Sequence, residues 1–175
     1  RFWENQVGRT PAFWKVVLPW FRSSFPEAPD WDEHTLNRLA NRVEKGFIRV
    51  EADDVTYNLH VMLRYEIEKQ LFNGELEVDD LPKAWNAMFK SWFDVDVPDD
   101  RLGCLQDIHW SMGAFGYFPT YTLGNLYAAQ LLEAMAVDLG DLDALVASGD
   151  WKPMLDWLRP RIHERGSQVL SLIHI

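Results

Sequence analysis

The chain has 175 residues, 47% of them hydrophobic and 25% charged, which excludes a disordered chain and allows one domain, or part of one, with a real core. Its formal net charge of −10 argues against nucleic-acid binding, which needs clustered Lys and Arg to meet the phosphate backbone. No apolar run approaches the ~20 residues of a membrane span, and a single cysteine, Cys104, excludes a disulfide framework and fits a reducing cytoplasm.

The spacing of apolar residues predicts helices along almost the whole chain. Thr10 and Pro11 are typical of a helix start, with an N-cap followed by proline in the first turn, and Pro26 ends this helix. Asp32 can cap a short second helix, which we expect to stop at Gly46 because glycine favours the helix C-terminus.

The middle of the chain predicts one extended segment and two helices. Residues 47–50 form a short, mostly apolar and β-prone run, so we expect a strand or extended segment there. Asp53 is placed to cap the longest helix, which continues to about Phe72, and another helix covers roughly residues 79–93. The predicted buried face of the longest helix is Leu59, Met62, Leu63, Ile67 and Leu71.

Residues 103–116 form the exception, because they mix polar and aromatic side chains with glycines and show no clean period. Pro119 begins another strong helix, and a last helix covers about residues 152–165. The sequence therefore predicts an all-α fold with one short extended segment near residues 47–50.

The histidine spacing predicts no metal site inside the chain. No two histidines are four residues apart, so there is no HExxH motif, and no CxxC, GxSxG or phosphate-binding glycine loop occurs. His60, near the apolar face of the longest helix, is expected to be structural. The five histidines are His34, His60, His109, His163 and His174.

Two polar-rich junctions carry a resemblance to a known family. Residues 48–53 read IRVEAD, and residues 103–110 read GCLQDIHW, followed by FGYFPTYTLGN at 115–125. The chain resembles the carboxypeptidase Taq family of zinc metallocarboxypeptidases, whose motifs read I-R-x-x-A-D and G-x-x-Q-D-x-H-W in this order. The opening segment WENQVGR, at 3–9, is also similar to that family.

The resemblance implies part of a larger, mostly helical HExxH zinc peptidase that releases single C-terminal amino acids from peptides. In that family the two histidines of the HExxH helix and a later glutamate bind zinc, and these ligands and the general-base glutamate precede the position of Arg1. We therefore expect residues 1–169 to be the C-terminal part of one catalytic domain, inactive alone. Residues 170–175 read LSLIHI, which CTG TCT CTT ATA CAC ATC encodes, so we expect a translated sequencing adapter there.

Arg49 is the residue to which the resemblance assigns the free α-carboxylate of the substrate. A guanidinium can bind a carboxylate through two parallel hydrogen bonds, and such a contact selects the chain end over internal bonds. The alternative is a structural ion pair with Glu51 or Asp53. Asp53 itself is expected to be a helix N-cap or to orient the residues that contact substrate.

The resemblance implies that His109 and Tyr121 donate hydrogen bonds to the oxyanion that develops when water attacks the scissile carbonyl. Tyr117 competes with Tyr121 for this role, and a satisfied core histidine is the alternative for His109. Gln106 and Asp107 are expected to orient the histidine or its loop.

The resemblance also implies zinc in the intact enzyme and peptides with a free C-terminus as substrates. We expect a cytoplasmic homodimer that binds neither nucleic acid nor membrane. Two other interpretations stay open: a helical zinc peptidase of the dipeptidase or oligopeptidase type, and a non-catalytic helical module that only binds peptides.

Overall fold

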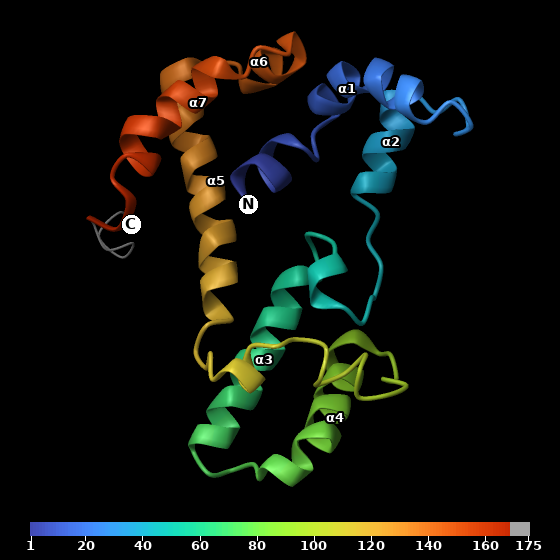
Figure 1. The fold of residues 1–175 in the computed structure, drawn as a ribbon, viewed down its shortest axis with the longest axis vertical. Coiled ribbons are helices and arrows are strands. Elements are labelled where there is room, and N and C mark those ends of the chain that lie inside the picture. The colour runs from blue at the N-terminus through green and yellow to red at the C-terminus, as the bar shows by residue number, and fades with distance from the viewer. Residues whose placement is uncertain (169–175) are drawn as a thin grey trace. The chain divides into compact units, whose positions relative to one another are not determined.

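The computed structural model describes residues 1–168, and these residues form helices and turns without a β-strand (Figure 1). The predicted all-α class is therefore confirmed. The described chain divides into two compact units, Arg1–Ala40 with the chain from Tyr127 onward, and Asn41–Leu126. Residues 170–175, the proposed adapter-encoded segment, lie outside the described residues. Within the described range, no helix combines the length and the apolar character that crossing a membrane requires.

The first unit packs helices around its own apolar core. α1 contacts both α2 and α6. As predicted, Thr10 caps α1, and its Oγ1 accepts the Phe13 N–H at 3.2 Å. The elements are α1 (Pro11–Ser24), α2 (Glu33–Ala40), the C-terminal part of α5 (Pro119–Leu139), α6 (Leu142–Ser148) and α7 (Lys152–Leu158), with π-helical turns at Phe2–Val7 and Arg159–His163. The core consists of Val7, Met135, Val146, Met154, Trp157 and Leu158.

The second unit contains both polar junctions. Its main helices are α3 (Tyr57–Phe72) and α4 (Leu81–Phe93), which pack on each other. The start of α5 and 3-10 turns at Arg49–Glu51, Val78–Asp80 and Trp110–Met112 complete it. Cys104 belongs to the core, where burial and then the Asp100 charge raise the pKa of its thiol. The core consists of Leu63, Ile67, Trp85, Phe89, Phe93 and Cys104.

The buried face of α3 is polar along much of its length. His60, Arg64 and Glu68 recur every four residues and are 0%, 1% and 4% exposed. Because residues four apart lie one above another on a helix, these side chains form a single buried row, the polar row of α3. Leu63 is buried as predicted, but Met62, which the sequence placed on the same face, is 50% exposed.

The expected strand or extended segment at 47–50 is found only in part, because Ile48 is extended but no strand forms there. Ile48 has extended dihedrals, with φ −93° and ψ 118°, and Arg49–Glu51 form a 3-10 turn closed by the Glu51 N–H to the Ile48 carbonyl at 3.2 Å. The described residues contain no strand that could pair with this segment, so its polar backbone groups bond locally and to side chains instead.

The other differences concern helix ends. α2 stops at Ala40 rather than Gly46; beyond it the apolar pattern has no surface to pack on, and Val43 is 56% exposed. The predicted helix at 152–165 is α7, which ends at Leu158 and passes into a π-helical turn. α6 was not predicted, although Asp141 caps it by accepting the Ala144 N–H at 2.9 Å.

Candidate functional site

Gln106 joins the two polar junctions. Its Oε1 accepts the main-chain N–H of Arg49 at 2.9 Å, while its Nε2 donates to the carbonyls of Phe47 at 2.9 Å and Leu102 at 3.1 Å. One amide therefore fixes the 3-10 turn that carries Arg49 against the loop that carries Asp107 and His109. Gln106 of the second motif thus also holds the main chain of the first motif.

The Arg49 guanidinium is buried in polar and aromatic contacts. Nη2 donates to Asp107 Oδ1 at 2.7 Å, Nε lies 3.4 Å from Oδ2, and Nη1 donates to the Tyr57 hydroxyl at 2.9 Å. The guanidinium carbon stands 4.6 Å from the centre of the Tyr121 ring. Arg49 is 4% exposed, and its ion-pair partner is Asp107, so the alternative of a pair with Glu51 or Asp53 is wrong.

Asp107 is shared between two buried arginines. Arg64 Nε donates to its Oδ2 at 2.7 Å, opposite the contact that Arg49 makes with Oδ1. Burial raises the pKa of Asp107, but the hydrogen bonds and charges of both guanidinium groups outweigh it and keep that pKa below its usual value. Burial lowers the pKa of Arg64 to about 10, so Arg64 stays charged near neutral pH. This cluster of two cations and one anion carries one excess positive charge.

His109 and Tyr121 are hydrogen-bonded to each other. His109 Nε2 lies 2.9 Å from the Tyr121 hydroxyl, and Nδ1 lies 3.7 Å from Asp107 Oδ1. Burial, and then the charges of Arg49 and Arg64, lower the pKa of His109, which keeps the imidazole neutral near pH 7. The nearby carboxylate favours a proton on Nδ1, in which case the tyrosine O–H donates to Nε2.

Tyr117 stands beside this pair without a comparable hydrogen bond among the described residues. Its ring centre is 5.7 Å from that of His109 and 5.4 Å from that of Tyr121, and the side chain is 49% exposed. Burial raises the pKa of Tyr121, which therefore keeps its proton. Of the two tyrosines, Tyr121 is the one that the structure joins to His109.

Asp53 makes N-cap-like hydrogen bonds in the turn just before α3, whose N-cap residue itself is Thr56. Its carboxylate accepts the N–H groups of Val55 at 2.9 Å and Thr56 at 3.0 Å, the Thr56 hydroxyl at 2.8 Å and the Glu44 N–H at 3.1 Å. Its own carbonyl accepts the Tyr57 N–H at 2.9 Å. Burial raises the pKa of Asp53, but these hydrogen bonds outweigh it and lower that pKa. Asp53 therefore fixes the start of α3.

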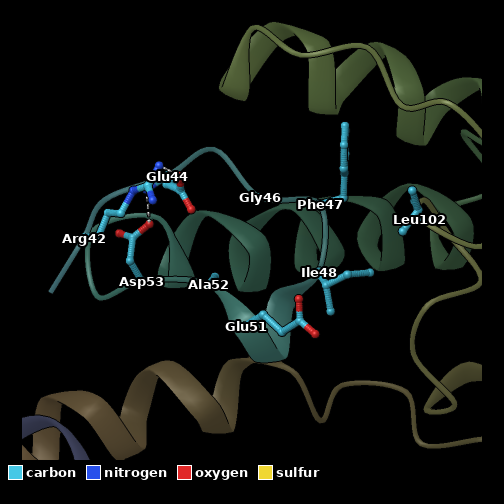
Figure 2. Close-up of a pocket in the computed structure, with 9 residues that line it drawn as sticks. All are labelled: Arg42, Glu44, Gly46, Phe47, Ile48, Glu51, Ala52, Asp53 and Leu102. Carbon is cyan, nitrogen blue, oxygen red and sulfur yellow. Dashed lines mark hydrogen bonds and ion pairs between the residues drawn. The ribbon is translucent and has the colours of Figure 1, made fainter. Parts of the chain in front are cut away.

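A cavity of about 330 Å³ opens beside this cap (Figure 2). Its rim carries an exposed ion pair between Arg42 and Glu44. Neither His109 nor Tyr121 lines it, so we assign no candidate chemistry to this cavity. Its lining residues are Arg42, Glu44, Gly46, Phe47, Ile48, Glu51, Ala52, Asp53 and Leu102.

Sequence reasoning missed the side chains of α3 that support the site. The Tyr57 hydroxyl accepts a hydrogen bond from Arg49, Arg64 donates one to Asp107, and Glu68 accepts the Trp110 indole N–H at 2.7 Å. A signal was present, because charged residues at positions 64 and 68 of a helix rich in apolar residues share one face with His60. His60 packs against aromatic rings, 4.6 Å from the Phe93 ring centre, as expected of a structural side chain.

The described residues offer no ligand set for a metal ion. Across residues 1–168, no group of three or more His, Cys, Asp or Glu side chains is arranged to hold one. We therefore derive no chemical step through a metal from these residues.

Comparison with known proteins places the chain in a family. The model of the carboxypeptidase Taq (M32) metallopeptidases matches residues 1–172. Thermostable carboxypeptidase 1 of Thermus thermophilus is 48% identical over 168 residues, which are 96% of this chain and 33% of that protein. Carboxypeptidase 1 of Bacillus subtilis is 41% identical over 172 residues, 98% of this chain and 34% of that protein. The chain thus spans about a third of the length of these curated relatives.

Solved structures agree. The structure titled "BsuCP Crystal Structure" superimposes with a TM-score of 0.91 at 41% identity, over 96% of this chain and 34% of that one. Trypanosoma cruzi metallocarboxypeptidase 1 gives a TM-score of 0.89 at 40% identity, over 96% of this chain and 35% of that one. The chain belongs to the carboxypeptidase Taq (M32) metallopeptidase family.

Proposed function

We propose that the protein containing this chain is a metal-dependent carboxypeptidase, and that residues 41–126 form the wall of its active site that binds the C-terminal carboxylate. The observation that carries this proposal is the excess positive charge of the cluster formed by Arg49, Arg64 and Asp107. Among the described residues Asp107 is the only carboxylate that ion-pairs with these two buried arginines, and an incoming substrate carboxylate would give Arg49 a second anionic partner.

Arg49 is the arginine best suited to the contact. A guanidinium has five N–H groups, and the bonds to Asp107 and Tyr57 use three of them, which leaves one on each terminal nitrogen. Two N–H groups on adjacent nitrogens match the two oxygens of a carboxylate. Because the side chain is only 5% exposed, we expect an aromatic neighbour such as Tyr121 to move when substrate binds.

Tyr121 and His109 would stabilise the negative charge that develops on the scissile carbonyl oxygen. The tyrosine O–H can turn from His109 Nε2 to this oxygen, and in the other tautomer the Nε2–H can donate as well. Tyr117 is the alternative donor, since half of its surface is free to meet substrate. Asp107 would orient His109 while it holds Arg49.

The family resemblance supports zinc as the metal of the whole protein and peptides with a free C-terminus as its substrates. The metal would activate the attacking water. We propose a cytoplasmic homodimer, for which the single cysteine and the family resemblance are the support.

The test is a full-length chimera in which residues 1–168 replace the matching third of the Thermus thermophilus relative. Arg49→Lys keeps the charge but loses the two-nitrogen contact, so kcat/KM for a peptide with a free C-terminus should fall about 100-fold. The matched control is Arg42→Lys, which changes an exposed arginine in the same unit.

An Arg49→Lys chimera as active as its control would contradict the assignment of Arg49. Equal cleavage of free and amidated peptides by the unsubstituted chimera would favour the dipeptidase or oligopeptidase interpretation. Peptide binding without cleavage would favour a non-catalytic module.

A further inference from the structure

Glu68 is a buried carboxylate that the proposed chemistry does not use. It is 4% exposed, and within residues 1–168 it forms no ion pair. A carboxyl group removed from water needs hydrogen-bond partners for its oxygens. Glu68 has two such partners: the Trp110 indole N–H donates to Oε1 at 2.7 Å, and the Gly116 main-chain N–H donates to Oε2 at 3.0 Å.

The two donors lie at opposite ends of one loop, and each is the immediate neighbour of a candidate catalytic residue. Trp110 follows His109, and Gly116 precedes Tyr117. Gly116 has φ +72°, a left-handed conformation that glycine adopts without strain. The carboxylate of Glu68 therefore joins the two ends of the 110–116 loop.

Packing transmits this restraint to the His109 ring. The Trp110 ring stands edge-on to Phe118, with ring centres 6.0 Å apart, and His109 packs on the same Phe118 ring at 4.4 Å. Rotation of the indole away from Glu68 would open the surface on which the His109 ring rests. The 2.9 Å contact between His109 and Tyr121 depends on this placement.

We infer that Glu68 is a positioning residue, which fixes His109 and Tyr117 toward the substrate by clamping both ends of the 110–116 loop. This inference rests on the proposed function for its catalytic meaning, but the placement of the loop can be tested without activity. Glu68 acts through its neighbours and is not expected to touch substrate.

The direct test is NMR of the His109 ring in the full 175-residue chain. Glu68→Gln keeps the size of the side chain, but its amide has one acceptor oxygen and an NH₂ group that would face a donor. One clamp bond is lost, so the ring ¹⁵N shifts that report the Nε2 hydrogen bond to Tyr121 should change. Glu66→Gln is the matched control, because Glu66 lies on the same helix in an exposed pair with Lys69.

Ring shifts read the protonation of His109 as well as its hydrogen bond, so they are compared at one pH where the imidazole is neutral in every variant. The charges and titrating groups that act on the ring are Asp107, Arg49, Arg64 and Glu68. Should Glu68→Gln fail to fold, Trp110→Phe makes the same test, because it removes the indole N–H together with part of the ring and leaves the carboxylate in place.

A folded Glu68→Gln variant whose His109 ring shifts match those of the unsubstituted chain overturns the inference. In the full-length chimera, the expected companion result is a fall of kcat by about 10- to 100-fold with KM little changed, because Arg49 keeps its partners. If the ring shifts change while kcat does not, the clamp stands and the catalytic role proposed for His109 is what fails.

Discussion

At the residue scale, one carboxylate controls the charge of the site. Asp107 bonds Arg49 and Arg64 through different oxygens and lies 3.7 Å from His109 Nδ1. The same group therefore holds the proposed carboxylate anchor and favours one tautomer of the proposed oxyanion stabiliser. Removal of this anion leaves two buried cations facing each other.

Asp107→Asn should lower the free energy of unfolding of the chain by about 3–5 kcal/mol, because it removes the counterion of two buried charges. Urea denaturation measures this loss. Asp96→Asn, which breaks an exposed pair with Lys90, should leave the midpoint unchanged within error. Equal midpoints for both variants would show that the buried cluster is not a source of stability.

Because the pKa of His60 is lowered in the folded chain, we expect the chain to lose stability in mild acid. Burial, followed by the charges of Arg64 and Arg49, lowers its pKa from 6.5 to about 4, so below pH 6.5 the unfolded chain binds a proton that the folded chain does not. Stability is therefore present above pH 6.5 and is lost as the pH falls toward 4, by about 3 kcal/mol over the window. Urea midpoints for His60→Phe should depend less on pH across this window. An unchanged pH dependence would show that His60 is not the source of the loss of stability.

Sequence reasoning identifies site residues only where a motif marks them. Arg49, Gln106 and Asp107 stand in short polar junctions, which single them out against helical surroundings. Glu68 and Arg64 stand inside a regular helix, where charged residues are read as the solvated face. The sequence shows that Arg64 and Glu68 share a face with His60, but it does not show which loop packs over that face.

At the element scale, α3 is the support on which the site is built. Its first turn is fixed by Asp53, and its polar row contacts the segments that carry the candidate residues. Asn58 adds a link to α5, where its Oδ1 accepts the Thr122 hydroxyl at 2.9 Å, next to Tyr121. Residues 47–50 contain an extended Ile48 but no strand, because an apolar, β-prone run becomes a strand only beside a partner strand.

Asp53→Ala should destabilise the start of α3 by about 1–2 kcal/mol, since it removes the acceptor of the Val55 and Thr56 N–H groups. Hydrogen exchange at these two amides measures the effect and should accelerate in the variant. Glu51→Ala, which changes a nearby exposed carboxylate, is the control. Unaltered exchange in Asp53→Ala would mean that the main chain alone fixes this turn.

At the scale of the whole molecule, the candidate site lies within one unit. Arg49, His109, Tyr117 and Tyr121 all belong to Asn41–Leu126, which has its own apolar core. The all-α class could be predicted from helical periodicity, whereas the division into two units could not, because α5 runs through both without a break in its pattern.

A fragment of residues 41–126 should therefore fold alone, with helical circular dichroism, cooperative thermal unfolding and a protected Trp110 indole N–H. Its core residues come from α3, α4 and the loop that contains Cys104, all of which the fragment retains. A fragment without a cooperative transition would show that the unit needs the rest of the chain.

We propose above all that this chain recognises the free C-terminal carboxylate of a peptide substrate. The most direct measurement uses the chimera in which residues 1–168 replace the matching third of the Thermus thermophilus relative. It compares the rates at which this chimera cleaves two peptides that differ only in having a C-terminal carboxylate or a C-terminal amide. The account predicts release of a single C-terminal residue from the free peptide and at least about 100-fold lower kcat/KM for the amide, because the amide cannot balance the charge of Arg49. Equal rates on both peptides, or release of dipeptides, would contradict it.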